Sequence, residues 1–465
     1  MQRKLNHLHF VGIGGIGMAG LAELLHAQGF EVTGSDLMAG PTIERLRDLG
    51  LRISIGHDAT SLGQAETVVR SSAIADDNVE LEAARRSDIP IVSRGALLAE
   101  IMRTKDGIAI AGSHGKTTTS AMTAHLLESA GLDPTALIGG RVPRPGGFAS
   151  PAKLGSGDLL VAEVDESDGS FLLTRPILAA ITNVDPEHLD YYGSRDALLR
   201  AFVEFANSVP FWGAAILGID HEGVLEIAPE ITARQVSFGF SEDADIRADR
   251  VEDIPGGQRC HVRLRRGSDF SFDLLMPGRH NILNALAAIA IALEQGVEVS
   301  ILSEALPNFP GVARRFERKG QTRGIEIVDD YAHHPAEVRA TLAGARSIHP
   351  GPITAIFQPH RYTRTRDCWE DFTGAFSDAD RVIISDIYAA SETPLPDIDG
   401  ERLANAIRRA GHPDAVFGGS LADIERDWPN RFGADELVLT LGAGSISTLG
   451  PKLLAAIDEM PEGDA

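Results

Sequence analysis

The segment IAIAGSHGKTTT at 108–119 carries residue types that could hold the phosphates of a nucleotide. Two glycines permit a tight turn whose backbone N–H groups face phosphate oxygens, and the helix expected next adds its positive N-terminal end. Lys116 can reach the β- and γ-phosphates, while the Thr117 hydroxyl suits Mg²⁺. Ile110 stands where the usual spacing has a glycine, so the loop is a shortened variant. We predict an MgATP loop formed by Gly112, Ser113, His114, Gly115, Lys116, Thr117 and Thr118.

A second glycine loop, GIGGIGM at Gly12–Met18, follows an apolar run and precedes a helical pattern. Its spacing is that of a dinucleotide-binding turn, and Asp36 lies about 20 residues on, where such folds place an acid for a ribose. Taken alone, the loop is typical of an NAD-type oxidoreductase. It specifies only that a diphosphate rests on a helix N-terminus, and an ATP loop farther along the chain argues against redox chemistry.

Acidic residues follow two buried strands of the central region. LLVAEVDESD at 159–168 and NVDPEHLD at 183–190 both begin apolar and end in carboxylates. The carboxyl ends of parallel strands converge beside a phosphate loop, so these are candidate Mg²⁺ ligands. Most of the acids fit solvated loop ends, but Glu163 and His188 stand where the strands should meet the nucleotide.

Cationic residues gather in the last third of the chain. QPHRYTRTRD at 358–367 holds His360, Arg361, Arg364 and Arg366, and GVARRF at 311–316 holds Arg315. In a chain with 43 Lys and Arg against 66 Asp and Glu, such a cluster is unusual for plain surface. Arginine binds carboxylates through two parallel hydrogen bonds, so the cluster predicts recognition of a carboxylate.

We expect strands that alternate with helices to position the glycine loops, the acidic residues and the cationic residues. Short apolar runs such as Leu8–Val11 and Ile108–Ala111 alternate with helical patterns, which favours parallel sheets covered on both faces. The exception is an expected antiparallel hairpin within 236–275. We predict three consecutive α/β domains: a Rossmann-like domain at 1–106, a central P-loop ATPase domain at 107–308 and a Rossmann-like domain at 309–465.

Composition narrows the function classes. The formal net charge of −23 argues against nucleic acid as a partner, because a basic face is needed to neutralise phosphates. No stretch is apolar enough for a membrane span, so no membrane insertion is expected. The two cysteines form no disulfide framework. We therefore expect a cytoplasmic protein.

Together these segments resemble the Mur ligase family over nearly the whole chain, with DDYAHHP at 329–335 and QPHRYTRTRD similar to its alanine-adding branch. The resemblance implies that ATP phosphorylates the carboxylate of UDP-N-acetylmuramic acid and that the amine of L-alanine attacks the acyl phosphate. This reaction is a cytoplasmic step of peptidoglycan synthesis. It further implies Mg²⁺ as cofactor, as two ions, with Mn²⁺ as a substitute.

The resemblance also implies a role for each matching residue. Lys116, Glu163, His188 and Arg315 look catalytic, and Thr117, Glu163 and His188 look like metal ligands. Asn281, Asn284, Arg315 and Asp330 would complete the ATP site. The sugar nucleotide would be held by Gly12, Gly14, Gly15, Gly17, Met18, Asp36, His57 and Ser71, and L-alanine by Tyr331, His360, Arg361 and Arg364.

Three alternatives remain open at this point. A recycling ligase that adds a preformed tripeptide to the same sugar nucleotide would share the loops. The others are the NAD-type oxidoreductase and a nucleotide-gated binding protein without catalysis, which the metal acids disfavour. Several sister ligases use a carbamylated lysine, which is absent here because no lysine lies between Lys153 and Lys319. The sequence is compatible with a monomer or a homodimer.

Overall fold

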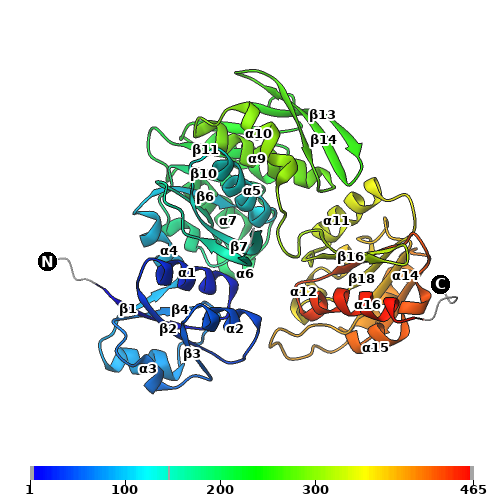
Figure 1. Cartoon of the computed structure of the whole chain (residues 1–465), viewed down its shortest axis with the longest axis horizontal. Coiled ribbons are helices and arrows are strands. Elements are labelled where there is room, and N and C mark those ends of the chain that lie inside the picture. The colour runs from blue at the N-terminus through cyan, green and yellow to red at the C-terminus, as the bar shows by residue number, and fades with distance from the viewer. Residues whose placement is uncertain (1–4, 145–146, 461–465) are drawn as a thin grey trace. The chain divides into compact units, whose positions relative to one another are not determined.

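The computed structural model describes residues 5–144 and 147–460 and contains three sheets (Figure 1). Its contacts divide the chain into two compact units. One, here called the first unit, comprises residues 1–250, 260–272 and 283–310; the second unit comprises 251–259, 273–282 and 311–465. Each unit is described by itself. The expected class of three consecutive α/β sheet structures is confirmed.

The N-terminal sheet has five parallel strands in the order β3-β2-β1-β4-β5. Residues of β1 alternate between two cores: Leu8 and Phe10 join the cluster that contains α1, whereas Val11 joins the cluster of α3. Helices therefore cover both faces, as the sequence predicts. The elements are β1 (His7–Val11), α1 (Ile16–Ala27), β2 (Glu31–Asp36), α2 (Pro41–Asp48), β3 (Arg52–Ile55), β4 (Thr67–Arg70), α3 (Val79–Arg86), β5 (Ile91–Ser93) and α4 (Arg94–Met102).

The central sheet has ten strands in the order β15-β14-β13-β12-β11-β10-β6-β9-β7-β8. Strand β6, which lies between β10 and β9, is followed by the turn at 112–115 and then by the buried helix α5. The elements are β6 (Asp106–Ala111), α5 (Lys116–Ser129), β7 (Thr135–Arg144), β8 (Gly147–Lys153), β9 (Leu159–Glu163), β10 (Leu178–Ile181), α6 (Leu189–Tyr192), α7 (Arg195–Ala206), β11 (Ala214–Gly218), α8 (Glu222–Ile227), β12 (Gln235–Gly239), β13 (Ile246–Ile254), β14 (Gly257–Leu264), β15 (Phe270–Leu274), α9 (Arg279–Glu294) and α10 (Val299–Ala305).

The C-terminal sheet has six strands in the order β16-β17-β21-β18-β19-β20, with only the β16–β17 pair antiparallel. Two apolar clusters lie on opposite faces of β18, one with Phe357 and one with Ile356. The elements are β16 (Glu317–Thr322), β17 (Ile325–Asp330), α11 (Pro335–Ile348), β18 (Ile353–Phe357), α12 (Tyr362–Asp367), α13 (Trp369–Thr373), β19 (Arg381–Ser385), α14 (Gly400–Arg409), β20 (Ala415–Gly419), α15 (Leu421–Asp427), β21 (Leu437–Leu441) and α16 (Leu449–Asp458).

The β7–β8 hairpin is the main element that sequence patterns did not predict. Its strands contain Gly139, Gly140, Pro143 and Pro151, residues that ordinarily indicate turns. The hairpin packs against α1 of the N-terminal sheet, where Gly20 would bring a Cβ within 3.6 Å of Leu137. Burial against that helix overrides the weak strand propensity of the glycines and prolines.

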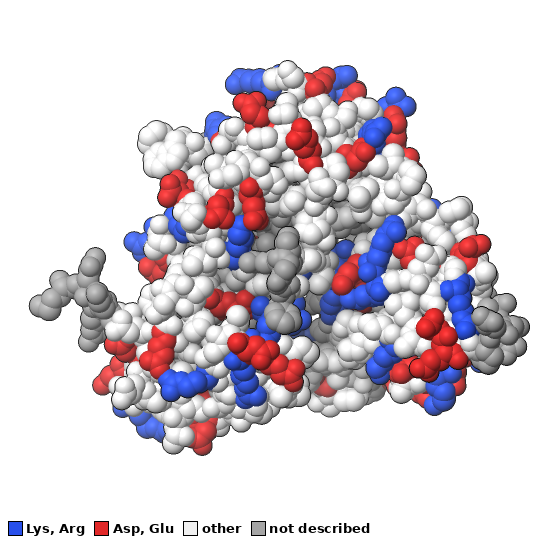
Figure 2. All heavy atoms as spheres, viewed as in Figure 1, with Lys and Arg blue, Asp and Glu red and all other residues white. Residues whose placement is uncertain are grey.

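The surface mixes charges of both signs. Figure 2 shows acidic and basic side chains interspersed over the visible face of each unit. Among the helices of the described residues, none has the length and apolarity needed to span a bilayer.

Candidate active site

The predicted phosphate loop lies between β6 and α5, at the point where the strand order of the central sheet reverses. Gly115 ends the loop in a left-handed conformation with φ of 83° and directly precedes α5. A Cβ on this glycine would overlap the side-chain oxygen of Asn284, which also accepts a hydrogen bond from Thr119 Oγ1 at 3.3 Å. Only glycine satisfies both the backbone and the close approach to α9.

The loop that follows β10 holds the phosphate loop from the other side. Asn183 Oδ1 accepts from the His114 N–H at 2.8 Å, and the Asp185 N–H donates to Ser113 Oγ at 2.8 Å. Asp185 Oδ2 also lies 3.1 Å from His114 Nε2. Hydrogen bonds from the His114 and His221 rings lower the pKa of Asp185 below its ordinary value. His114 and Ser113 thus fix the shape of the loop.

Lys116 points back into its own loop. Its Nζ donates to the carbonyl oxygens of Gly112 and Ser113 and to Glu166 Oε1, the last at 2.7 Å. Burial alone would lower the pKa of Lys116, but the carboxylates of Glu166 and Glu163 outweigh it and raise that pKa. The ammonium is therefore charged and held at the position where a phosphate would meet it.

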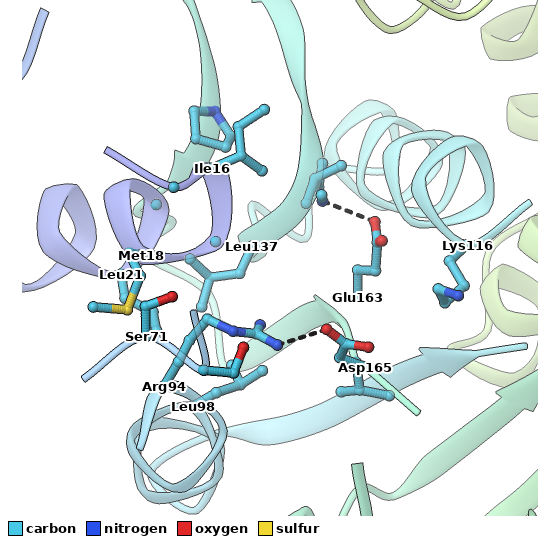
Figure 3. A pocket seen from close by; sticks show the side chains of 18 residues that line it. Ile16, Met18, Leu21, Ser71, Arg94, Leu98, Lys116, Leu137, Glu163 and Asp165 are labelled. Carbon is cyan, nitrogen blue, oxygen red and sulfur yellow. Dashed lines mark hydrogen bonds and ion pairs between the residues drawn. The ribbon is translucent and has the colours of Figure 1, made fainter. Parts of the chain in front are cut away.

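A cavity in the first unit is lined by the N-terminal glycine loop and by Lys116, the first residue of α5 (Figure 3). One wall comes from α1, α4 and the segment after β4, and the other comes from β7, β8, the end of β9 and Lys116 of α5. Its polar lining includes Gly15, Gly17, Ser71, Ser72, Arg94, Lys116, Gly139, Glu163 and Asp165. The predicted sugar-nucleotide loop and the predicted ATP lysine therefore line the same cavity.

The N-terminal glycine loop is held by Asp36 through the chain's own backbone. Asp36 Oδ2 accepts the Gly14 N–H at 2.8 Å, and a Cβ on Gly14 would come within 2.8 Å of that oxygen. This bond occupies an oxygen that a dinucleotide site would offer to a ribose. Gly12 turns the chain after β1 with φ of 79°. Met18 is buried in α1, in the lining of the cavity.

His57 lies in a buried polar network behind β2. Its Nδ1 is 2.9 Å from Ser35 Oγ and 3.3 Å from Glu80 Oε2, and Glu80 is fully buried. The His9 ring, whose Nε2 lies 3.7 Å from the carboxylate, and a hydrogen bond from Ser35 together outweigh burial and hold the pKa of Glu80 below its ordinary value, so it stays ionised. Glu80 and Ser35 therefore fix the ring of His57, which is absent from the cavity lining.

Glu163 ends β9 inside the cavity, where its Oε2 accepts the Gly139 N–H at 2.8 Å. Thr117 and Thr118 are buried in the first turn of α5, beside Lys116. Carboxylate and hydroxyl oxygens are ligands that Mg²⁺ prefers, so these residues fit the ion. His188 directly precedes α6 with a φ of 58°, and its ring lies 3.7 Å from Glu187. His188 is likewise absent from the lining of the cavity.

In the second unit, Arg315 and Tyr331 are stacked. The Arg315 guanidinium lies 5.0 Å from the centre of the Tyr331 ring, which Arg314 approaches at 4.9 Å. Asp330 accepts the N–H groups of Phe316 at 2.7 Å and Ala332 at 2.8 Å, and burial raises its pKa to about 6. Asp330 therefore anchors the turn that presents Arg315 and Tyr331.

The predicted cationic cluster forms at the ends of β17 and β18. Arg364 donates to His360 Nδ1 at 3.2 Å, and the His360 ring stacks on Tyr388 at 5.5 Å. Burial and the Arg364 charge lower the pKa of His360 to about 4, so the ring is neutral near pH 7. Arg361 adopts a φ of 70° at the start of α12 and donates its N–H to the Tyr388 carbonyl.

Sequence reasoning missed several partners of these residues. His333 stacks edge-on against both Tyr331 and His360, at 5.2 and 6.0 Å, although it stands in a quoted motif. Glu166 is one of the acids of 159–168 that the sequence offers as candidate Mg²⁺ ligands or solvated loop ends; it is instead buried and accepts from Lys116. Tyr388 follows β19, and the only sequence feature that could have indicated it is its position after a predicted strand.

Asn281, a predicted residue of the ATP site, lies in the first turn of α9 and donates to the Pro277 carbonyl at 2.7 Å.

Comparison with known proteins gives consistent results along the chain. Profiles described as Mur ligase family, catalytic domain; Mur ligase middle domain; and Mur ligase, glutamate ligase domain match residues 7–106, 110–292 and 314–444. A UDP-N-acetylmuramate--L-alanine ligase from Anaeromyxobacter dehalogenans is 51% identical over 97% of this chain and 98% of its own.

Solved structures agree with these matches. A UDP-N-acetylmuramate-alanine ligase from Thermotoga maritima superimposes with a TM-score of 0.84 at 29% identity, covering 97% of this chain and 98% of its own. A murein peptide ligase from Psychrobacter arcticus gives a TM-score of 0.72 at 25% identity, covering 98% and 99%.

Proposed function

The chain belongs to the Mur ligase family, and we propose that within it this protein joins L-alanine to the carboxylate of UDP-N-acetylmuramic acid at the expense of ATP. The observation that carries the proposal is the cavity that a diphosphate-type loop and Lys116 of an ATP loop line together. Such a cavity suits transfer of a phosphoryl group from ATP to a group on a sugar nucleotide. The sequence identity to alanine-adding relatives selects the acceptor.

The chemistry runs in two steps. A carboxylate oxygen attacks the γ-phosphorus of ATP, ADP leaves, and an acyl phosphate forms. The amine of L-alanine then attacks the acyl carbon, and the tetrahedral intermediate expels inorganic phosphate to leave the amide. Phosphorylation is needed because a carboxylate is a poor electrophile, and catalysis is mainly positioning and charge neutralisation.

Residues of the first unit do most of the phosphoryl transfer in this proposal. Lys116 exchanges Glu166 for the phosphates, the backbone of Gly112–Thr117 holds them, and Asn284 is proposed to bind the base. Asn281, which belongs to the second unit, is assigned the same role. Thr117, Glu163 and His188 would hold Mg²⁺, as two ions with Mn²⁺ as a substitute. A bound metal would supply charge neutralisation at the phosphoryl group.

Residues of the second unit bind the incoming amino acid and the phosphates. As the family resemblance implies, Arg315 would bind phosphate, Asp330 would bind ribose, and the L-alanine ligands would be Tyr331, His360, Arg361 and Arg364. The neutral ring of His360 accepts from Arg364, which leaves further guanidinium N–H groups for a carboxylate. In this proposal the domain at 1–106 binds the sugar nucleotide, the domain at 107–308 binds ATP and the domain at 309–465 binds the amino acid.

Two alternatives are weighed against this proposal. A tripeptide-adding ligase is the nearer one, and the murein peptide ligase is similar at 25% identity, against 51% for the alanine-adding relative. The oxidoreductase alternative loses its main support, because Asp36 binds Gly14 and an ATP loop shares the cavity. We propose a cytoplasmic enzyme, monomeric or homodimeric, with small-molecule substrates and without nucleic-acid or membrane partners.

Phosphate release by the purified protein tests the function. With MgATP and UDP-N-acetylmuramic acid, we expect turnover on addition of L-alanine and little on addition of the tripeptide. Glycine and L-serine are useful comparisons, since a single methyl group contributes only about 1–3 kcal/mol of discrimination. Turnover with the tripeptide alone would overturn the alanine assignment, and no turnover with any amine would overturn the ligase assignment.

A further inference from the structure

Arg94 is a cation of the cavity to which no role has yet been given. It begins α4, on the side of the N-terminal sheet, and its side chain is 19% exposed. Its Nη2 donates to Asp165 Oδ2 at 2.9 Å, and Asp165 follows β9 of the central sheet. Figure 3 shows this pair crossing the cavity, with Glu163 and Lys116 on the Asp165 side.

The stem of Arg94 lies against the N-terminal glycine loop. A Cβ placed on Gly17 would be 3.2 Å from Arg94 Cδ and 3.3 Å from its Nη1. The first turn of α1 has no acidic residue, and its N-cap Gly15 offers no side chain. The end of α1 therefore presents N–H groups and a guanidinium to the same region of the cavity, beside the Ser71 and Ser72 hydroxyls.

We propose that Arg94 binds the diphosphate of the sugar nucleotide and that Asp165 is the positioning residue that aims its guanidinium. The inference rests on the proposed function. A helix N-terminus supplies only about half a positive charge, whereas a diphosphate carries at least two negative charges. Guanidinium has five N–H donors in a planar fork that matches phosphate oxygens, and the bond to Asp165 uses one of its nitrogens.

Asp165 is itself fixed, as a positioning group must be. Its Oδ1 accepts the Ser167 N–H at 3.0 Å, while Oδ2 receives Arg94. The Arg94 guanidinium is thus set by a carboxylate from the central sheet and its stem by the N-terminal glycine loop. Both sheets belong to the first unit, so the guanidinium and its carboxylate partner lie within one compact body.

Calorimetric titration of UDP-N-acetylmuramic acid, UDP and UMP into wild type and variants tests the proposal. For Arg94→Ala we expect at least tenfold weaker binding of the sugar nucleotide and of UDP. The loss for UMP, which lacks the second phosphate, should be several-fold smaller, and ATP should bind within twofold of wild type. Arg94→Lys keeps the charge without the fork and should fall between the two.

Arg141→Ala is the matched control. Arg141 Nη2 donates to Thr42 Oγ1 at 2.7 Å and so also ties the central sheet to the N-terminal sheet, but Arg141 is not among the residues that line the cavity. We expect it to bind UDP within twofold of wild type. An equal loss of UDP affinity in both Arg variants, or an equal loss for UMP and UDP in Arg94→Ala, would overturn the proposal and leave Arg94 a structural tie.

Asp165→Asn separates positioning from direct binding. It should weaken UDP binding less than Arg94→Ala does, and the double variant should be no weaker than Arg94→Ala alone. Additive losses would overturn the positioning role of Asp165. These readouts are independent of catalysis: a wild-type protein that binds UDP but never releases phosphate would overturn the ligase proposal, while UDP binding by Arg94→Ala within twofold of wild type would overturn this one.

Discussion

At the scale of single residues, the site holds its charges in place before any substrate arrives. Lys116 has three oxygen partners within its own loop and in Glu166, and Asp36 is bonded to Gly14. Such internal bonds lower the reorganisation needed when phosphate oxygens take their place. The two residues hold different loops: Lys116 binds the carbonyls of the phosphate loop, and Asp36, at the end of β2, binds the N-terminal glycine loop.

Lys116→Ala should therefore remove ATP turnover and leave binding of the sugar nucleotide nearly unchanged. The loss of a buried cation that faces the transferring phosphoryl group should lower kcat/KM by about 100-fold or more. Phosphate release measures the first effect and calorimetry the second. Lys105→Ala is a control, because Lys105 donates to the Gly155 and Gly157 carbonyls and is not in the cavity lining. Loss of both ligands together in Lys116→Ala would contradict the separation of the loops.

At the scale of elements, the two ends of α5 illustrate what a local turn contributes. Gly115 precedes the helix with φ of 83° and Gly131 follows it with φ of 77°. A side chain at 115 would meet Asn284, whereas one at 131 would meet nothing within 4 Å. The two glycines therefore share a backbone requirement and differ only in their surroundings.

Gly131→Ala should cost about 1 kcal/mol of unfolding free energy, the strain of a left-handed residue. Gly115→Ala should cost more, because α9 must also move, and it should weaken ATP binding at least tenfold. Urea denaturation and ATP titration measure the two effects. Equal stability losses with equal ATP affinities would show that Asn284 does not constrain the loop.

Some of these elements can be predicted from the sequence, whereas others depend on contacts between distant residues. Both glycine loops, the ends of β9, β17 and β18, and the cationic cluster follow from apolar runs that end in polar residues, a local pattern. The β7–β8 hairpin does not, because its glycines and prolines indicate turns and only contact with α1 makes them strands. Arg94 was missed for a related reason: its pairing with Asp165, 71 residues away, leaves no local pattern.

At the scale of the whole molecule, the N-terminal and central sheets share one hydrophobic cluster. Leu21 and Leu24 of α1 belong to the same buried group as Leu137 of β7 and Phe202 of α7. Apolar surface that two sheets bury jointly is exposed when either unfolds. The first unit should therefore open as one cooperative body, despite holding two sheets.

Hydrogen exchange with UDP tests this cooperativity. A ligand at 100 times its Kd stabilises its bound state by about 2.7 kcal/mol, which corresponds to roughly 100-fold slower exchange through global opening. We expect that slowing in β1 and also in β6 and β10, which bind no UDP in the proposed site. Protection confined to residues 5–106 would contradict the shared opening.

The shared cluster also bears on how genes of this family can recombine. A crossover near residue 106 would join an α1 surface selected against one hairpin to a hairpin selected against another. Chimeras made there should express poorly unless Gly20, Leu137 and Pro151 come from the same parent, since a Cβ on Gly20 would lie 3.6 Å from both partners. In such chimera libraries the N-terminal and central sheets would have to be exchanged as one piece. We expect substrate range to change only in chimeras that take both sheets from the same parent.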